Sequence, residues 1–359
     1  MTKPVGVFNP CSVARSGVIQ LADGKLIFAR GVPALGVAVI DASVPHGQVP
    51  VSLEQDEVSG DITLSNGLIS AVIDQKGEIT SLRRGGVDVS VAEQDRTSDL
   101  NTLELYEDVP HMWDAWDIDA QYEDKPRDAT YNITSIEVAS DDPLRCAVKF
   151  SRKLGALSSI EQTYTLDAGS PRLDVHNRVD WHEHRTFLRA RFPTRINSER
   201  ASYEIQFGVV ERPTHRNTTW DAAKFEVCAH RWMDLAQPGL GLAILNDSKY
   251  GHSCHGGELG LSLLRAPKHP DPNADIGLHE FTYSMMPHGG DWRAAGVDRE
   301  AEALNTPMLA YVLNSGEDGV LGGRYSPITI HAAGSAQVAV AALKASEDGT
   351  GLILSLIHI

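Results

Sequence analysis

The chain has 359 residues, with 32 Lys and Arg against 48 Asp and Glu, and therefore a net charge of −16 at pH 7. A surface this acidic repels phosphate groups, which excludes nucleic acids and anionic membrane surfaces as partners. No apolar run approaches the roughly 18 residues that span a bilayer. Because 42% of the residues are hydrophobic, we expect a folded protein with one large or two medium domains.

The sequence predicts a cytoplasmic location. The N-terminal residues MTKPVGVFNP lack the apolar region and the small-residue cleavage site of a secretory signal. The four cysteines are widely spaced and give no disulfide framework, which fits a reducing compartment.

Residues 1–50 are expected to form a small β domain. The stretch VPHGQVPVSLEQDEVSG (44–60) combines prolines, glycines and acidic residues, as domain boundaries often do. We therefore place a boundary near residue 50 and expect one large β domain over residues 51–353.

Strands dominate the rest of the pattern. The clearest is 173–181, LDVHNRVDW, in which apolar and polar residues alternate as in a half-buried strand. Similar runs, separated by turn residues, occur at 68–73, 133–138, 185–192, 203–209, 239–245, 307–313 and 337–343. The best helix candidate, 221–235, is short and lacks firm caps. Many short strands without alternating helices predict an all-β fold of sandwiches or barrels.

The segment 105–119, LYEDVPHMWDAWDID, holds two tryptophans, a tyrosine and five carboxylates. Aromatic faces bind the C–H patches of sugars, and carboxylates accept hydrogen bonds from sugar hydroxyls, so this composition suits a carbohydrate. The alternative is a loop whose tryptophans anchor the core and whose acids cap turns. Paired carboxylates also suggest glycosidase chemistry, but the spacing identifies no acid/base pair.

One cluster could in principle hold a metal ion: His252, Cys254 and His255 in GHSCHGG. Adjacent ligands on a glycine-flanked turn rarely complete a tetrahedral site, so we favour a polar loop and predict no metal. The sequence contains no GxxxxGK[ST], GxGxxG, HExxH or GxSxG motif, which leaves nucleotide-binding, zincin and α/β-hydrolase functions without support.

The segment LYEDVPHMWDAWDID resembles a signature of bacterial members of glycoside hydrolase family 38, the α-mannosidases. The similarity continues in the same order through five further motifs: FPTRI (192–196), HRNTTWDAAKFEV (215–227), LNDSKYG (245–251), LSLLRAPKHPDP (261–272) and HEFTYSMMPH (279–288). With GVFNPCSVARSGVIQL and LSNGLISAVIDQKGEITSL near the start, it extends over residues 5–353. The resemblance implies a small β-sandwich domain followed by a galactose-mutarotase-like supersandwich.

The resemblance covers only the C-terminal half of such an enzyme. In the family, retaining hydrolysis of terminal α-mannosides takes place on an N-terminal α/β domain, with an aspartate nucleophile, an acid/base aspartate and zinc held by two His and two Asp. The family's GHxHxD zinc motif does not occur here, and WHEH (181–184) is better explained as a polar strand end. The resemblance thus implies that this chain holds no catalytic residue and no cofactor. It implies that zinc binds in the missing catalytic domain. We therefore expect the chain alone to be inactive.

In full-length relatives the β domains brace the catalytic domain and line part of its cleft. The resemblance therefore implies that domain and an α-mannoside or oligosaccharide as partners, and leaves a homo-oligomer open. Arg265 is the first candidate for a sugar contact, because guanidinium donates in a fixed fork; an interdomain ion pair is the alternative. Trp116, Asp117 and Tyr122 are further candidates, with core packing and loop capping as the alternative.

The segment ALKASEDGTGLIL (342–354) resembles the family's last sandwich segment, after which further strands are expected. The chain instead reads LSLIHI, a hexapeptide that one frame of a common transposase adapter encodes. We therefore expect residues 354–359 to be a non-native tail.

Two other functions remain open. One is a free-standing carbohydrate-binding module. The other is a mutarotase-type enzyme, which requires a histidine acid and a glutamate base on one sheet face; His176 and His182, on the polar face of a predicted strand, are the histidines to test. The mutarotase-type function is suggested only by analogy of fold.

Overall fold

The computed structural model describes residues 4–41, 47–91, 98–129, 132–313, 323–329 and 338–358. Strands make up 53% of the described residues and helices 7%, and the strands form several antiparallel sheets, which confirms the all-β prediction. The chain divides into two compact units, one formed by Met1–Val49 with Glu302–Ile359 and the other by Pro50–Ala301. None of the helices in the described ranges is long and apolar enough to cross a membrane.

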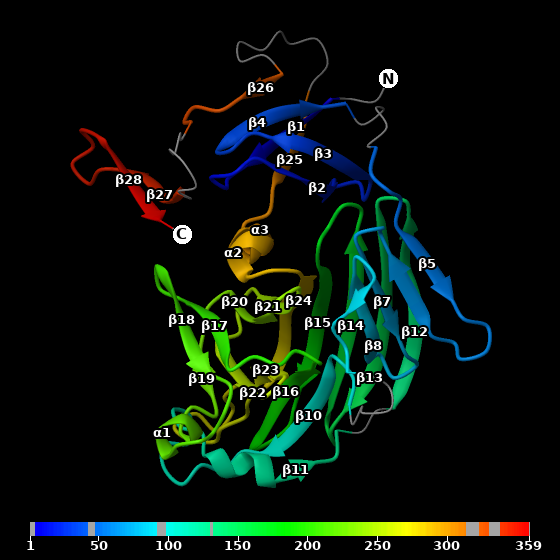
Figure 1. Ribbon diagram of the computed structural model, residues 1–359, viewed down its shortest axis with the longest axis vertical. Coiled ribbons are helices and arrows are strands. Elements are labelled where there is room, and N and C mark those ends of the chain that lie inside the picture. Colours follow the sequence, from blue (N-terminus) through cyan, green and yellow to red (C-terminus); the bar gives the residue numbers. More distant parts are fainter. Residues whose placement is uncertain are drawn as a thin grey trace. The chain divides into compact units, whose positions relative to one another are not determined.

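The first unit is built from both ends of the chain (Figure 1). Its four-stranded sheet has the order β25-β1-β4-β26, and β2 pairs with β3 in a hairpin. The bounds are β1 (Val5–Asn9), β2 (Arg15–Gln20), β3 (Leu26–Val32), β4 (Gly36–Ile40), β25 (Leu309–Val312) and β26 (Arg324–Tyr325). Apolar residues of β1 to β4, such as Val7, Ala29 and Val32, form its core.

Residues after 301 thus return to the N-terminal unit, whereas the sequence suggested a large domain reaching residue 353. Alternation at 307–313 predicts a strand there but does not say which sheet it joins; β25 pairs with β1, and β26 with β4. A separate hairpin joins β27 (Val338–Ala345) to β28 (Leu352–His358). Residues 354–358, expected to be a non-native tail, lie in β28, and residue 359 lies outside the described residues.

The second unit contains three sheets (Figure 1). Their strand orders are β12-β13-β14-β15-β24-β21-β20-β17-β18, β11-β10-β16-β23-β22-β19 and β5-β6-β7-β8-β9. The bounds are β5 (Ser52–Gln55), β6 (Ile62–Ser65), β7 (Ile69–Ile73), β8 (Ile79–Arg84), β9 (Val87–Asp88), β10 (Thr102–Glu107), β11 (Pro126–Arg127), β12 (Ile133–Asp142), β13 (Arg145–Leu154), β14 (Ser158–Asp167), β15 (Leu173–Trp181), β16 (Thr186–Pro193), β17 (Arg200–Ile205), β18 (Gly208–Pro213), β19 (Val227–Cys228), β20 (Trp232–Gln237), β21 (Leu240–Asn246), β22 (Gly251–His255), β23 (Glu258–Leu264) and β24 (Gly277–His288).

A buried polar network links these three sheets. The Gln162 amide on β14 donates to Tyr283 on β24 at 2.9 Å, and the Tyr283 hydroxyl donates to Asn101 beside β10. The Asn101 amide donates to the Tyr164 hydroxyl at 2.6 Å, which in turn donates to the Gly77 carbonyl in the β7–β8 turn. Buried polar groups carry a large penalty unless they are hydrogen-bonded, so this network fixes how the sheets face one another.

The strand predicted at 173–181 is confirmed as β15, with alternate residues buried. The weak helix candidate at 221–235 is helical only where it overlaps α1 (Thr219–Ala222), and the segment continues into β19 and β20. Pairing of β20 with β21 outweighs the short helical pattern. The sequence interpretation missed α3 (Val297–Asn305), which follows α2 (Trp292–Ala295). The run predicted at 203–209 is a hairpin of β17 and β18.

Candidate functional site

The signature loop, defined as residues 108–119, leaves the six-stranded sheet where three neighbouring strands share an edge. Strand β10 ends there, β16 begins and β23 ends, because each is antiparallel to the next. The amide of Asp108 donates to the Arg185 carbonyl at 2.9 Å, and the Arg185 amide donates to the Ala266 carbonyl at 3.0 Å. The topology thus brings the loop, the start of β16 and the segment after β23 together.

The loop exposes its aromatic side chains. Trp113 and Trp116 are 63% and 72% exposed, so they are not core anchors, and Val109 and Met112 are exposed beside them. The Trp113 carbonyl accepts hydrogen bonds from the amides of Trp116 (2.8 Å) and Asp117 (2.9 Å) and closes a tight turn. Trp113 itself has φ of 58°, a left-handed conformation that is rare for a bulky residue.

Arg265, the first candidate for a sugar contact, holds this loop. Its Nε and Nη2 atoms donate to the two carboxylate oxygens of Asp108 at 2.6 and 2.9 Å. Nη2 also donates to the carbonyls of Asp117 (2.7 Å) and Asp114 (3.2 Å). The Asp108 side chain is only 2% exposed, so the pair is largely shielded from water. Arg265 therefore forms an ion pair within its own unit, rather than the interdomain pair that was the alternative.

Asp114 forms a second clamp on the loop. Its Oδ1 accepts from Arg185 Nη1 at 2.9 Å, and its Oδ2 accepts from the amides of Lys268 (2.6 Å) and His269 (3.0 Å). Burial raises the pKa of Asp114, but the Lys268 amide, the Arg185 charge and the His269 amide together lower it below its ordinary value. The carboxylate is thus fixed in its ionised form.

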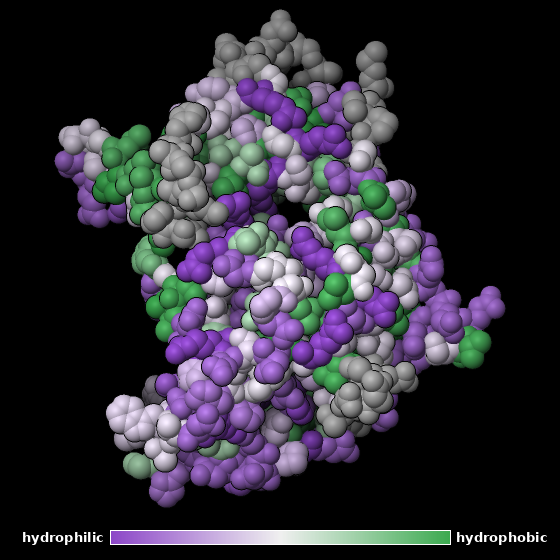
Figure 2. Space-filling view, viewed as in Figure 1, coloured by the Kyte–Doolittle hydropathy of each residue, from purple (hydrophilic) through white to green (hydrophobic). Residues whose placement is uncertain are grey.

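Asp117 is exposed next to Trp116, as the sugar-binding prediction requires. Its Oδ1 accepts from the neighbouring Ile118 amide at 3.0 Å. At the base of the loop lies a small hollow that is open to solvent and lined by Glu107, Asp108, Val109, Pro110, Asp119, Gln121, Tyr122 and Lys125. The end of the unit near β11 and α1 is mostly hydrophilic (Figure 2).

Tyr122 lies in the core rather than on the surface. It belongs to the 3₁₀ turn η2 (Ala120–Asp124) that follows the loop and is 3% exposed. Its hydroxyl donates to Glu226 at 3.1 Å and accepts from Arg189, while Arg189 and Glu226 form an ion pair at 2.9 Å. Burial raises the pKa of Tyr122 and of Glu226. Sequence reasoning missed Arg189 and Glu226, because nothing local marks two buried charges that meet across strands.

The segment around α1 is joined by an ion pair to η2, the turn that follows the signature loop. Arg216 donates through both terminal nitrogens to the Glu123 carboxylate of η2, at 2.8 and 2.7 Å. Trp220 on α1 is 82% exposed. Of the six tryptophans in the chain, the three exposed ones lie in the signature loop and on α1, and the other three are buried.

The sequence GHSCH forms strand β22, so the expected polar loop is wrong. Burial lowers the pKa of His252 to about 4, and its ring nitrogens lie 3.1 Å from the Tyr250 carbonyl and 3.4 Å from the Asn246 amide. Burial raises the pKa of Cys254 to about 12, so a thiolate ligand is disfavoured. His255 contacts the Thr214 carbonyl instead of a neighbouring ligand.

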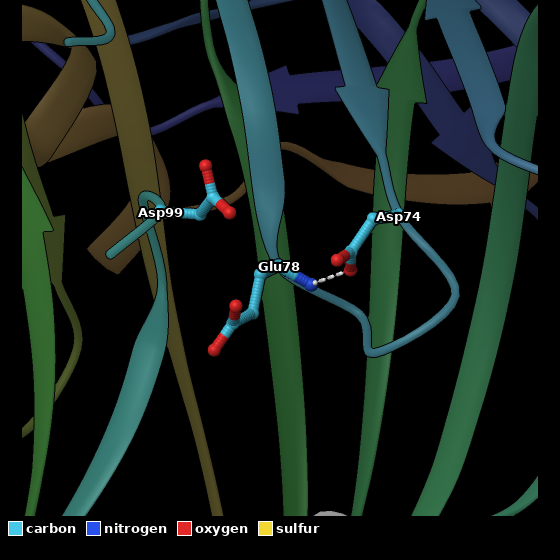
Figure 3. A group of neighbouring side chains, drawn as sticks. All are labelled: Asp74, Glu78 and Asp99. Atoms are coloured by element: carbon cyan, nitrogen blue, oxygen red, sulfur yellow. Dashed lines mark hydrogen bonds between the residues drawn. The ribbon is translucent and has the colours of Figure 1, made fainter. Parts of the chain in front are cut away.

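Within the described ranges, one group of three or more possible ligands clusters: Asp74, Glu78 and Asp99, whose ligand atoms lie within 4.8 Å of one another (Figure 3). Asp74 Oδ1 already accepts from the amides of Lys76 and Glu78, both at 2.9 Å, and closes the β7–β8 turn. All three ligands are carboxylates, whereas zinc in proteins prefers nitrogen and sulfur. These residues do not fit a zinc site.

The two histidines considered for a mutarotase-type reaction lie at β15. His176 has Thr163 and Thr282 as its direct cross-strand neighbours, and the glutamates two residues further along these strands, Glu161 and Glu280, form ion pairs with Arg178. His182 lies just after β15 and pairs with Asp180 at 2.8 Å. Neither arrangement favours this alternative.

Residues 64–273 match the sequence model of the glycosyl hydrolases family 38 C-terminal domain, which is more than half of the chain. The chain belongs to glycoside hydrolase family 38. This confirms the resemblance that the motifs suggested. The signature loop, Arg189, Glu226 and Arg265 all lie within the matched residues.

Family 38 relatives agree with this assignment. The chain is 44% identical over 283 residues to human alpha-mannosidase 2C1, covering 78% of this chain and 27% of that protein. It is 37% identical over 307 residues to alpha-mannosidase G of Dictyostelium discoideum, and the match covers 84% of this chain and 28% of that protein. The chain thus spans about a quarter of the length of these relatives. A family 38 protein from Enterococcus faecalis has the same fold, with a TM-score of 0.74 at 13% identity over 98% of this chain and 52% of that one.

Proposed function

We propose that this chain is the C-terminal β portion of an α-mannosidase whose catalytic domain hydrolyses terminal α-mannosides with retention. The family match and the relatives named alpha-mannosidases support this role. The described residues offer zinc no set of nitrogen and sulfur ligands, so we assign the zinc ion to the catalytic domain. The four cysteines, all within the described residues, form no disulfide, which supports a cytoplasmic location.

Within the enzyme, this portion braces the catalytic domain and contributes the signature loop to the wall of the sugar site. The observation that carries this role is a loop that exposes Trp116 and Asp117 on a backbone held by Arg265 and Asp114. A tryptophan face can stack on the C–H side of a pyranose, and a carboxylate can accept from its hydroxyls. A fixed backbone lowers the entropy lost when the sugar binds.

Trp116→Ala tests this role through binding of methyl α-mannoside, followed by ligand-detected NMR. We expect the variant to bind about five- to tenfold more weakly, because it loses one stacking contact. Its melting temperature should not change, since the side chain is 72% exposed. Trp220→Ala, which removes an exposed tryptophan outside the loop, is the matched control and should bind normally. Equal affinity of Trp116→Ala and the unaltered chain, or no binding by either, would contradict the proposal.

A further inference from the structure

We infer that Asp114 is the positioning residue of the signature loop, which it holds in the conformation that presents Trp116 to a sugar. The inference rests on the proposed function. Asp114 is set apart from the other loop carboxylates by its contacts, because it alone joins the loop to two other segments through its side chain. It contacts the start of β16 through Arg185 and the segment after β23 through the amides of Lys268 and His269.

Both carboxylate oxygens of Asp114 are used in these contacts. The side chain is 12% exposed, and its pKa is lowered, so it neither offers a proton nor reaches outward to accept one. A direct sugar contact or an acid/base role therefore does not account for it. A role in holding the loop does, since charge-assisted hydrogen bonds to amides and guanidinium are strong and directional.

The backbone is strained both at the residue before Asp114 and at its ionic partner. Trp113, the preceding residue, has φ of 58°, and Arg185, its ionic partner, has φ of 47°. Non-glycine residues persist in this left-handed region only where their surroundings fix them, and such residues cluster at ligand-binding sites. Without the Asp114 clamp, Trp113 is free to relax toward negative φ.

Relaxation at Trp113 would reach the proposed sugar contact directly. The Trp113 carbonyl accepts from the amides of Trp116 and Asp117, so its rotation opens the turn that carries both side chains. Arg265 contacts the loop mainly at Asp108 and through backbone carbonyls, and it stays in place when the Asp114 carboxylate is changed. Asp114 thus acts through Trp113 on Trp116.

The test is Asp114→Asn in the full chain, with methyl α-mannoside as the probe. Asn keeps the size of the side chain but lacks the charge and one acceptor. We expect affinity to fall about tenfold, because the loop must then be ordered on binding. Hydrogen exchange at the Trp116 and Asp117 amides should accelerate, while the β15 amides stay protected.

Asp221→Asn is the matched control. Asp221 is a similarly shielded carboxylate, 17% exposed, that accepts a hydrogen bond from the hydroxyl of Thr218, the N-cap of α1, and its pKa is also lowered. This variant should lose similar stability and keep its sugar affinity, which separates positioning from a general loss of stability.

Three outcomes are distinguishable. Weaker binding with faster loop exchange in Asp114→Asn alone supports the inference. Unchanged affinity in Asp114→Asn, while Trp116→Ala binds weakly, overturns the inference and leaves the proposed function standing. Unchanged affinity in Trp116→Ala, or no binding by the unaltered chain, overturns the proposed function and with it the positioning role.

Discussion

Glu78 shows at the scale of one residue how burial changes a carboxyl group. Its side chain, after the β7–β8 turn, is 7% exposed. Burial raises its pKa, the Thr102 hydroxyl opposes the shift, and Asp74 adds to it. The pKa of Glu78 is therefore higher in the folded state than in the unfolded state. Its contribution to stability is fully present below the ordinary pKa of a glutamate, and this contribution is lost as the pH rises through the folded-state pKa.

Glu78→Gln should therefore stabilise the protein at neutral pH. We expect its melting temperature to exceed that of the unaltered chain by a few degrees, roughly 2–4 °C, at pH 7, and the difference to vanish toward pH 4. Thermal unfolding at several pH values measures this. Glu57→Gln, in an exposed turn, is the control and should change little. A destabilised Glu78→Gln, together with a melting temperature that rises when calcium is added, would instead indicate a cation held by Asp74, Glu78 and Asp99 (Figure 3).

At the scale of the element, β21 shows how one glycine permits a side-chain contact between the two strands that flank it, β20 and β24. Gly241 faces His288 on β24 and Ala236 on β20. The His288 imidazole passes over Gly241 and forms a 2.6 Å contact with Asp234 of β20, and both side chains are buried. A Cβ on Gly241 would lie 2.3 Å from His288 Cε1, so any other residue displaces the ring.

Gly241→Ala should destabilise the protein by roughly 2–4 kcal/mol, because the displaced imidazole leaves a buried carboxylate without its partner. Urea unfolding of the full chain measures the change. Gly208→Ala is the matched control, since the nearest atom to its Cβ would lie at 3.9 Å. Similar stability of the two variants would show that the His288–Asp234 contact contributes little.

Elements with a strong local pattern could be predicted from the sequence, and contacts between distant residues could not. Residues 173–181 alternate between apolar and polar except at Asn177, and the structure buries the face that carries the apolar residues. The Arg265–Asp108 pair joins residues 157 positions apart, so no spacing reveals it. The aromatic and acidic composition of residues 105–119 pointed to the loop itself. That Trp116 is exposed and Tyr122 buried depends on the strand edge behind them.

At the scale of the whole molecule, the family assignment predicts what the chain does alone, as does the absence of a zinc site from the residues that the structure describes. The purified chain, supplied with zinc, should release no product from an aryl α-mannoside above a heat-denatured control. The physical reason is that no described cluster combines the nitrogen ligands that hold catalytic zinc. Steady, zinc-dependent release would place catalytic groups in this chain, and residues 106–119 would be the first to mutate.

The pairing of β1 with β25 and of β4 with β26 has a consequence for synthesis on the ribosome. About 270 residues separate β4 from β25, and at roughly 5–20 residues per second their translation takes about 15–55 s. During that time β1 and β4 emerge with one edge each unfilled, and exposed edges invite association with other nascent chains. The intervening unit can fold first, since its sheets use only residues 50–301. A chaperone that shields the first 40 residues would therefore raise the yield of folded protein.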